Sequence, residues 1–312
     1  MTLIVVLGMH RSGTSAVTRV LNRLGATIGD PADLDRNWEN VPLREWNRRL
    51  LEAAGGAWDA PPLLSPGWAG DRSVARLAQP AVSDLDALLA VPVSAWKDPR
   101  TCLTLPFWRP HLGAAPVALV VYRHPVEVLA SLRARRLPDD PDTSDAPGAP
   151  GAERFADAHG LALWERYNLD ALRNAAGMPA VIADYADVLA DPLAWAGETV
   201  DALAGLGARL PGDPADGVAE LDPGRRHHDA GAELDHPEAT SQQVDLWRRL
   251  AALPRRFDEL PPDLDLPAPA AVSSEILAAH ALERRRRGEL RRLSGSRRAL
   301  LARLARRMRP GR

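Results

Sequence analysis

The sequence contains only one cysteine, Cys102, among its 312 residues, so it has neither an internal disulfide nor a cysteine-rich metal site. It also lacks the run of about 20 apolar residues that a membrane-spanning helix needs. The first apolar run has no basic region before it and is too short to be a signal peptide. We therefore expect a cytoplasmic protein.

Lysine is almost absent. The chain has 39 lysine and arginine residues together, and reading the sequence finds a single lysine, Lys97. An arginine stays protonated in proteins, whereas the compact ammonium group of lysine can share or lose a proton and acts as a point charge. A lysine that persists in a chain so biased toward arginine suggests a position that needs this chemistry.

The small net charge of -2 conceals two parts of opposite sign. Residues 275–312 hold 13 arginines and three glutamates, a net charge of +10, so the preceding residues carry -12. An acidic body is not typical of a nucleic-acid-binding protein, and we expect no nucleic-acid partner. We favour a solvated tail helix packed on the body or on a protein partner; the alternative is a helix that binds an anionic membrane surface.

Short apolar runs alternate with segments of helical periodicity, which predicts a parallel sheet with right-handed crossovers. The division is one α/β domain over residues 1–269 and a basic helical tail over residues 270–312. Strands are expected at residues 3–7, 92–96, 117–122 and 180–183, and helices at residues 16–24, 39–51, 73–89, 104–112, 125–136, 153–176, 192–206, 241–253 and 274–308. The rest of residues 209–269 is predicted as loop.

Residues 8–15, GMHRSGTS, join the first strand to the first helix. Gly8 and Gly13 match the outer glycines of the phosphate-binding pattern G-x-x-x-x-G-K-[ST], but Thr14 replaces its lysine and Arg11 supplies a cation inside the loop. Such a loop directs backbone N–H groups and a helix N-terminus at one point, which suits a phosphate. The candidate anion-binding residues are Arg11, Ser12, Gly13, Thr14 and Ser15.

Two other cations follow strand ends. Lys97 comes after the second expected strand, and Arg123 comes after the third, with Ser131 two turns into the next helix. Ligands of open α/β sheets bind at the carboxyl ends of the strands. Arg123 and Ser131 therefore form a candidate second anion site, and a nucleotide with two separate phosphates would need two such sites.

These motifs resemble those of sulfotransferases that use 3′-phosphoadenosine 5′-phosphosulfate (PAPS). HRSGTS is similar to the 5′-phosphosulfate loop of that family, and YRHPVEVLAS, residues 122–131, resembles the motif in which an Arg and a Ser eight residues later hold the 3′-phosphate. The Lys97-Asp98-Pro99 segment looks like that of carbohydrate and tyrosyl-protein sulfotransferases. The resemblance implies a three-layer P-loop-like α/β fold, PAPS as the sulfuryl donor and no obligatory metal.

The resemblance also implies roles for single residues. Lys97 would stabilise the leaving group, and Asp98 would orient Lys97 or Arg11. Glu39 is our first choice of general base, with a first-turn carboxylate stabilised by the helix dipole as the alternative; His10 is the second choice. Arg225 and Arg226 resemble a late loop that closes over the 3′-phosphate, or they belong to a surface turn.

Two rival functions remain. A P-loop kinase or NTPase would need Mg²⁺ and a lysine where Thr14 stands. A non-catalytic nucleotide-binding scaffold would not depend on Lys97. We favour a PAPS-dependent sulfotransferase that acts on a hydroxyl or amine of a small-molecule or carbohydrate acceptor.

Overall fold

The computed structural model describes residues 1–113, 116–134, 156–219, 221 and 231–307, and the side chains of residues 290–307 lie outside that description. The described elements are, in chain order and with η for a short 3-10 helix, β1 (Thr2–Leu7), α1 (Thr14–Arg23), η1 (Pro31–Asp33), α2 (Val41–Ala53), η2 (Trp68–Gly70), α3 (Arg72–Ala75), α4 (Ala78–Leu89), β2 (Val93–Lys97), α5 (Thr101–Trp108), η3 (Arg109–His111), β3 (Val117–Tyr122), α6 (Pro125–Arg133), α7 (Asp157–Ala175), β4 (Ala180–Asp184), α8 (Tyr185–Ala190), α9 (Pro192–Gly205), α10 (Pro214–Val218), α11 (Ser241–Ala251), β5 (Arg256–Phe257) and α12 (Ala271–Arg307).

The strands form one sheet in the order β2-β1-β3-β4-β5. The first four are mutually parallel, and the short β5 runs antiparallel to β4. Val6 pairs with Lys97, and Leu7 pairs with Val120, so the carboxyl ends of β1, β2 and β3 lie at the same edge. This edge receives all three cation-bearing segments identified in the sequence. The sequence predicted loop where β5 and α10 form.

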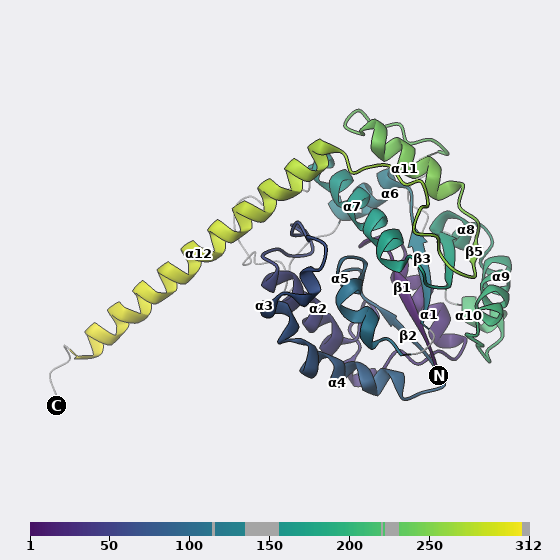
Figure 1. The fold of residues 1–312 in the computed structure, drawn as a ribbon, viewed down its shortest axis with the longest axis horizontal. Coiled ribbons are helices and arrows are strands. Elements are labelled where there is room, and N and C mark those ends of the chain that lie inside the picture. Colours follow the sequence, from purple (N-terminus) through teal and green to yellow (C-terminus); the bar gives the residue numbers. More distant parts are fainter. Residues whose placement is uncertain (114–115, 135–155, 220, 222–230, 308–312) are drawn as a thin grey trace.

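Alternate side chains of the strands enter two separate hydrophobic cores, because successive residues of a strand point to opposite faces. In β1, Leu3, Val5 and Leu7 join the core beneath α2, α4, α5 and α7. Ile4 and Val6 join the core beneath α1 and α9 on the other face. Figure 1 shows these two layers of helices around the sheet. The predicted α/β fold, with a central and mostly parallel sheet between helices, is confirmed.

Two predicted helices differ in detail. Residues 73–89 form α3 and α4 instead of one helix. The helix expected at residues 104–112 is α5, which begins earlier and holds Pro106 in its interior. A proline has no N–H to donate to the carbonyl four residues earlier, that of Cys102. The side chain of Asn174 donates to this carbonyl at 2.8 Å, which replaces the lost helical bond.

The long helix α12 is attached to the body through Glu165 of α7. This carboxylate is buried, and it accepts hydrogen bonds from the backbone N–H of Ala270, from the Ser273 hydroxyl and from the Gln243 amide of α11. The helix stays in contact with the body as far as Arg284, which pairs with Asp59 at 3.0 Å, and its later turns project away from the body (Figure 1). Within the described part of the chain, no helix is long and apolar enough to cross a membrane.

We predict that Glu165→Ala lowers the free energy of unfolding by about 2–4 kcal/mol, because it leaves several buried donors without an acceptor. Hydrogen exchange at residues 271–282 is expected to accelerate more than exchange in β1 or β3, since the start of α12 loses its anchor.

The control is Glu198→Ala, which removes an exposed ion pair with Arg255 and is expected to change stability by less than about 1 kcal/mol. Equal effects of the two substitutions would contradict the anchoring role of Glu165.

Candidate active site

The loop between β1 and α1 is tightly packed at both of its glycines. The Gly8 N–H donates to the thiol sulfur of Cys102 at 3.1 Å, and a side chain on Gly8 would place its Cβ 2.4 Å from the Val121 carbonyl oxygen. Gly13 has a φ of 90°, and a Cβ there would lie 2.1 Å from the Tyr185 ring. Both positions therefore require glycine, which fixes the path of the loop.

This loop leaves polar groups available at the start of α1. The first N–H groups of a helix have no partner within the helix, and no described side chain caps α1. Ser12 is fully buried, and its hydroxyl has no hydrogen-bond partner among the described residues. Arg11 has a φ of 71°, an uncommon conformation for a residue with a side chain. Together with Thr14 and Ser15, which begin α1, these groups suit an anion.

The second candidate anion site is in direct contact with the first. The Arg123 guanidinium donates to the Arg11 carbonyl at 3.3 Å and to the Glu127 carboxylate at 2.7 Å, and it lies over the Tyr185 ring. The Arg11 Nε donates to the Ser131 hydroxyl at 2.8 Å. The structure thus brings together the residues that the sequence assigned to two phosphates.

Lys97 joins the loop to Glu39. Its Nζ lies 2.9 Å from Oε1 of Glu39 and 3.2 Å from the Ser15 hydroxyl. The Lys97 and Glu39 side chains are only 1% and 8% exposed. Burial raises the pKa of Glu39 above its ordinary value of 4.5, and the Lys97 charge opposes this rise. The single lysine of the chain therefore lies between the candidate anion-binding loop and the candidate base.

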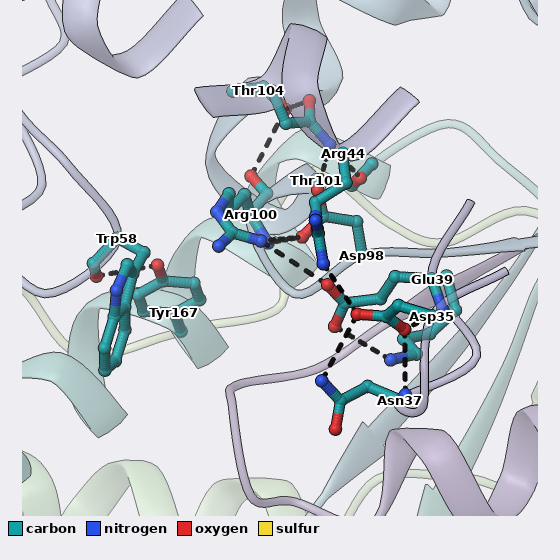
Figure 2. A network of polar contacts seen from close by, with 12 residues as sticks. Asp35, Asn37, Glu39, Arg44, Trp58, Asp98, Arg100, Thr101, Thr104 and Tyr167 are labelled. Carbon is teal, nitrogen blue, oxygen red and sulfur yellow. Dashed lines mark hydrogen bonds and ion pairs between the residues drawn. The ribbon is translucent and has the colours of Figure 1, made fainter. Parts of the chain in front are cut away.

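Glu39 is held in a tight turn by Asp35, a residue that we did not single out in the sequence. One oxygen of the Asp35 carboxylate accepts from the backbone N–H groups of Asn37 and Glu39, and the other accepts from Arg44 at 2.7 Å (Figure 2). Trp38 inside this turn has a φ of 63°. An aspartate four residues before Glu39, in a turn-rich segment, was the available signal.

Asp98 has different partners from those we expected. Its carboxylate contacts the Arg100 guanidinium at 3.0 Å and the Asn47 amide at 2.8 Å, whereas we had expected it to orient Lys97 or Arg11. Arg100 in turn lies 3.6 Å from Oε2 of Glu39 (Figure 2). Neither Arg100 nor Asn47 was among the residues assigned to the site from the sequence.

His10, our second choice of base, packs between aromatic rings. Its ring centroid lies 4.5 Å from that of Trp58 and 5.7 Å from that of Tyr167. Arg225 and Arg226 lie outside the described residues. Over the ranges that the structure describes, no cluster of three or more His, Cys, Asp or Glu side chains is arranged to hold a metal ion.

Comparison with known proteins gives few matches. No protein-family model and no curated protein matches the chain. Among solved structures, a sulfotransferase domain from the Synechococcus PCC 7002 olefin synthase is similar over 90% of this chain and 94% of its own, at 16% identity and a TM-score of 0.39. A sulfotransferase domain from the curacin biosynthetic pathway is similar over 89% and 96%, at 14% identity and a TM-score of 0.36. Both of these similar structures are sulfotransferase domains.

The raised pKa of Glu39 predicts how Glu39→Gln changes the pH dependence of stability. Above pH 4.5 the unfolded chain loses the Glu39 proton while the folded chain keeps it, so this group makes wild-type stability fall as pH rises toward the folded pKa. Relative to wild type, the free energy of unfolding of Glu39→Gln should therefore increase with pH in this window, by about 1.4 kcal/mol for each unit by which burial raises the pKa.

Denaturant unfolding at a series of pH values measures this difference. The control is Glu45→Gln, because Arg48 and Arg49 lower the pKa of Glu45 to about 2, and its difference from wild type should stay flat above pH 4.5. A flat or falling difference for Glu39→Gln would show that the folded protein does not raise the pKa of Glu39.

Proposed function

We propose that this protein is a PAPS-dependent sulfotransferase that transfers a sulfuryl group to a hydroxyl or amine of a small-molecule or carbohydrate acceptor. One observation carries this proposal. Lys97 contacts both Ser15 of the glycine-bounded loop and the buried carboxylate of Glu39, while Arg123 and Arg11 connect the same loop to Ser131. A phosphate loop, a second anion site, a cation and a candidate base are thus connected by direct contacts.

The residues present fit a nucleotide with phosphates at both its 5′ and 3′ positions. The uncapped start of α1 and the buried Ser12 hydroxyl would hold the 5′-phosphosulfate. Arg123 and Ser131 would hold the 3′-phosphate, since an arginine presents a fork of N–H groups that matches phosphate oxygens. The Ser12 hydroxyl, which has no partner within the described part of the chain, supports this fit, because buried polar groups normally have a partner.

When bound, PAPS supplies the sulfuryl group, whose bond to the 5′-phosphate breaks as its bond to the acceptor oxygen or nitrogen forms. Lys97 is the cation beside the loop, where it neutralises negative charge that grows on a bound phosphate oxygen. Glu39 accepts the acceptor's proton, because a carboxylate with a raised pKa is a stronger base than an exposed one. The leaving group would be 3′-phosphoadenosine 5′-phosphate (PAP), whose 5′-phosphate oxygen keeps the electron pair of the broken bond, and the proton taken by Glu39 would pass to solvent.

The position of the lysine argues against a P-loop kinase. In the kinase pattern the lysine precedes the helix-starting Ser or Thr, and here Thr14 holds that place. Lys97 instead reaches the loop from the end of β2 and is paired with Glu39. The contact between Lys97 and the Glu39 carboxylate suits a reaction in which a base removes the acceptor's proton next to the leaving group.

The proposal predicts selective thermal stabilisation by PAP. At a concentration of about 100 times its dissociation constant, PAP should stabilise the folded state by about 2.7 kcal/mol, in EDTA as well as in Mg²⁺. ADP and ATP lack the 3′-phosphate and should stabilise much less. Arg123→Gln should weaken PAP binding by about 10- to 150-fold, because a hydrogen bond to a charged group contributes about 1.5–3 kcal/mol.

Arg133→Gln, which removes an exposed cation from the same helix, is the matched control and should leave PAP binding unchanged. Mg²⁺-dependent stabilisation by ATP with no response to PAP would overturn the sulfotransferase proposal in favour of a kinase or NTPase. PAP binding with no PAP release from PAPS in the presence of acceptors would indicate a nucleotide-binding scaffold.

A further inference from the structure

Each oxygen of the Glu39 carboxylate has its own cation. Lys97 lies 2.9 Å from Oε1, and Arg100 lies 3.6 Å from Oε2. The Lys97 and Arg100 side chains are 1% and 4% exposed, so neither pair is screened by solvent. The two cations are not equivalent, because Lys97 also contacts Ser15 of the loop whereas Arg100 contacts a second carboxylate, that of Asp98.

Arg100 is fixed by a buried polar network. One oxygen of Asp98 accepts from the backbone N–H and the guanidinium of Arg100, and the other accepts from the Asn47 amide. Asn47 also donates to Thr101, and its carbonyl oxygen accepts from Thr104 and Trp108. In Figure 2, dashed lines join Arg100 to both Asp98 and Glu39. Arg100 is thus held by Asp98, which is in turn held by Asn47 of α2.

When Glu39 is ionised, the two cations Lys97 and Arg100 face the two carboxylates of Glu39 and Asp98. A buried carboxylate that loses its sole cation is strongly destabilised in its charged form. Under the proposed function, Lys97 is drawn to negative charge at the loop, and Glu39 would then lack a partner if Lys97 were its only cation.

We propose that Arg100, clamped by Asp98 and Asn47, is a positioning residue that keeps the Glu39 carboxylate ionised and oriented while Lys97 serves the phosphate oxygen. This inference rests on the proposed function, since it assigns Glu39 and Lys97 their roles in that reaction. It adds that a second cation, Arg100, supports the ionised Glu39 carboxylate when Lys97 interacts with the phosphate oxygen.

Four charged groups from three segments face Glu39. Lys97 and Asp98 come from the end of β2, Arg100 from the start of α5, and Asp35 from the turn before α2. Lys97 and Arg100 favour the ionised carboxylate, whereas Asp98 and Asp35 oppose it. Asp35 is itself paired with Arg44. Without Arg100, Lys97 would be the one remaining cation of these four groups that favours the ionised Glu39, while the Asp98 and Asp35 carboxylates would still oppose it.

The test is an NMR titration of Glu39 in the full chain without nucleotide. Protein labelled with ¹³C at the glutamate carboxyl carbons is titrated, and the Glu39 signal is identified by its absence in Glu39→Gln. In Arg100→Gln the pKa of Glu39 is expected to rise by about one to three units, since an adjacent arginine lowers a carboxyl pKa by that amount. Arg100→Lys, which keeps the positive charge, should restore most of the wild-type value.

Arg166→Gln is the matched control, because it removes another partly buried arginine, paired with Asp170 on α7, and should leave the Glu39 titration unchanged. Because Arg100→Gln leaves Asp98 unpaired, a second comparison guards against misfolding. Asp98→Asn and the double variant Asp98→Asn/Arg100→Gln bury no unpaired Asp98 charge, and the pKa of Glu39 should be higher in the double variant.

A Glu39 titration that is the same with and without Arg100, in both backgrounds, would overturn the inference. The acid limb of PAP release from PAPS should move to higher pH in Arg100→Gln, and an unmoved limb would also overturn it. A different result tests the proposed function: it is contradicted if PAP does not stabilise the wild-type protein. The NMR titration would then still measure the effect of Arg100 on the pKa of Glu39, but Arg100 would have no role in sulfuryl transfer.

Discussion

The ion pair between Lys97 and Glu39 is the interaction on which the site depends. Both side chains are buried, and a buried charge is tolerated only when it is paired and hydrogen-bonded. The pair joins the end of β2 to the turn before α2, and the contact of Lys97 with Ser15 adds the start of α1. Three segments far apart in the sequence are therefore held at one edge of the sheet. A chain that otherwise uses arginine keeps lysine here, where a compact cation reaches both a hydroxyl and a carboxylate.

Close packing around the loop between β1 and α1 holds the charged side chains of the site near one another. Gly8 approaches the backbone of β3, and Gly13 lies against the Tyr185 ring, so the loop packs closely against the strand ends. The same ring lies beneath the Arg123 guanidinium, which links the loop to the second anion site. Because the supports of the two candidate anion sites are shared, their separation is set by the packing of the sheet and not by flexible side chains. This arrangement suits a rigid ligand that carries two phosphates.

Much of the fold was predictable, because buried parallel strands appear as apolar runs and their ends mark the ligand edge. The segments bearing Arg11, Lys97 and Arg123 were located in this way. The sequence did not predict β5, whose two residues give no periodic signal, or the position of Pro106 inside α5, which depends on Asn174 from a distant helix. It also missed Asp35, Asn47 and Arg100. These residues act through contacts made only after folding. The one local signal for Asp35 was its place in a turn-rich segment before Glu39, and no short-range pattern distinguishes Asn47 or Arg100 from surface polar residues.

A crystal structure of the protein with PAP bound tests the central claim most directly. The account predicts the 5′-phosphate on the backbone N–H groups of residues 12–15 with Lys97 beside it, and the 3′-phosphate on Arg123 and Ser131. Glu39 should remain in contact with Arg100. A nucleotide bound elsewhere, or one whose 3′-phosphate lies away from Arg123 and Ser131, would contradict the account.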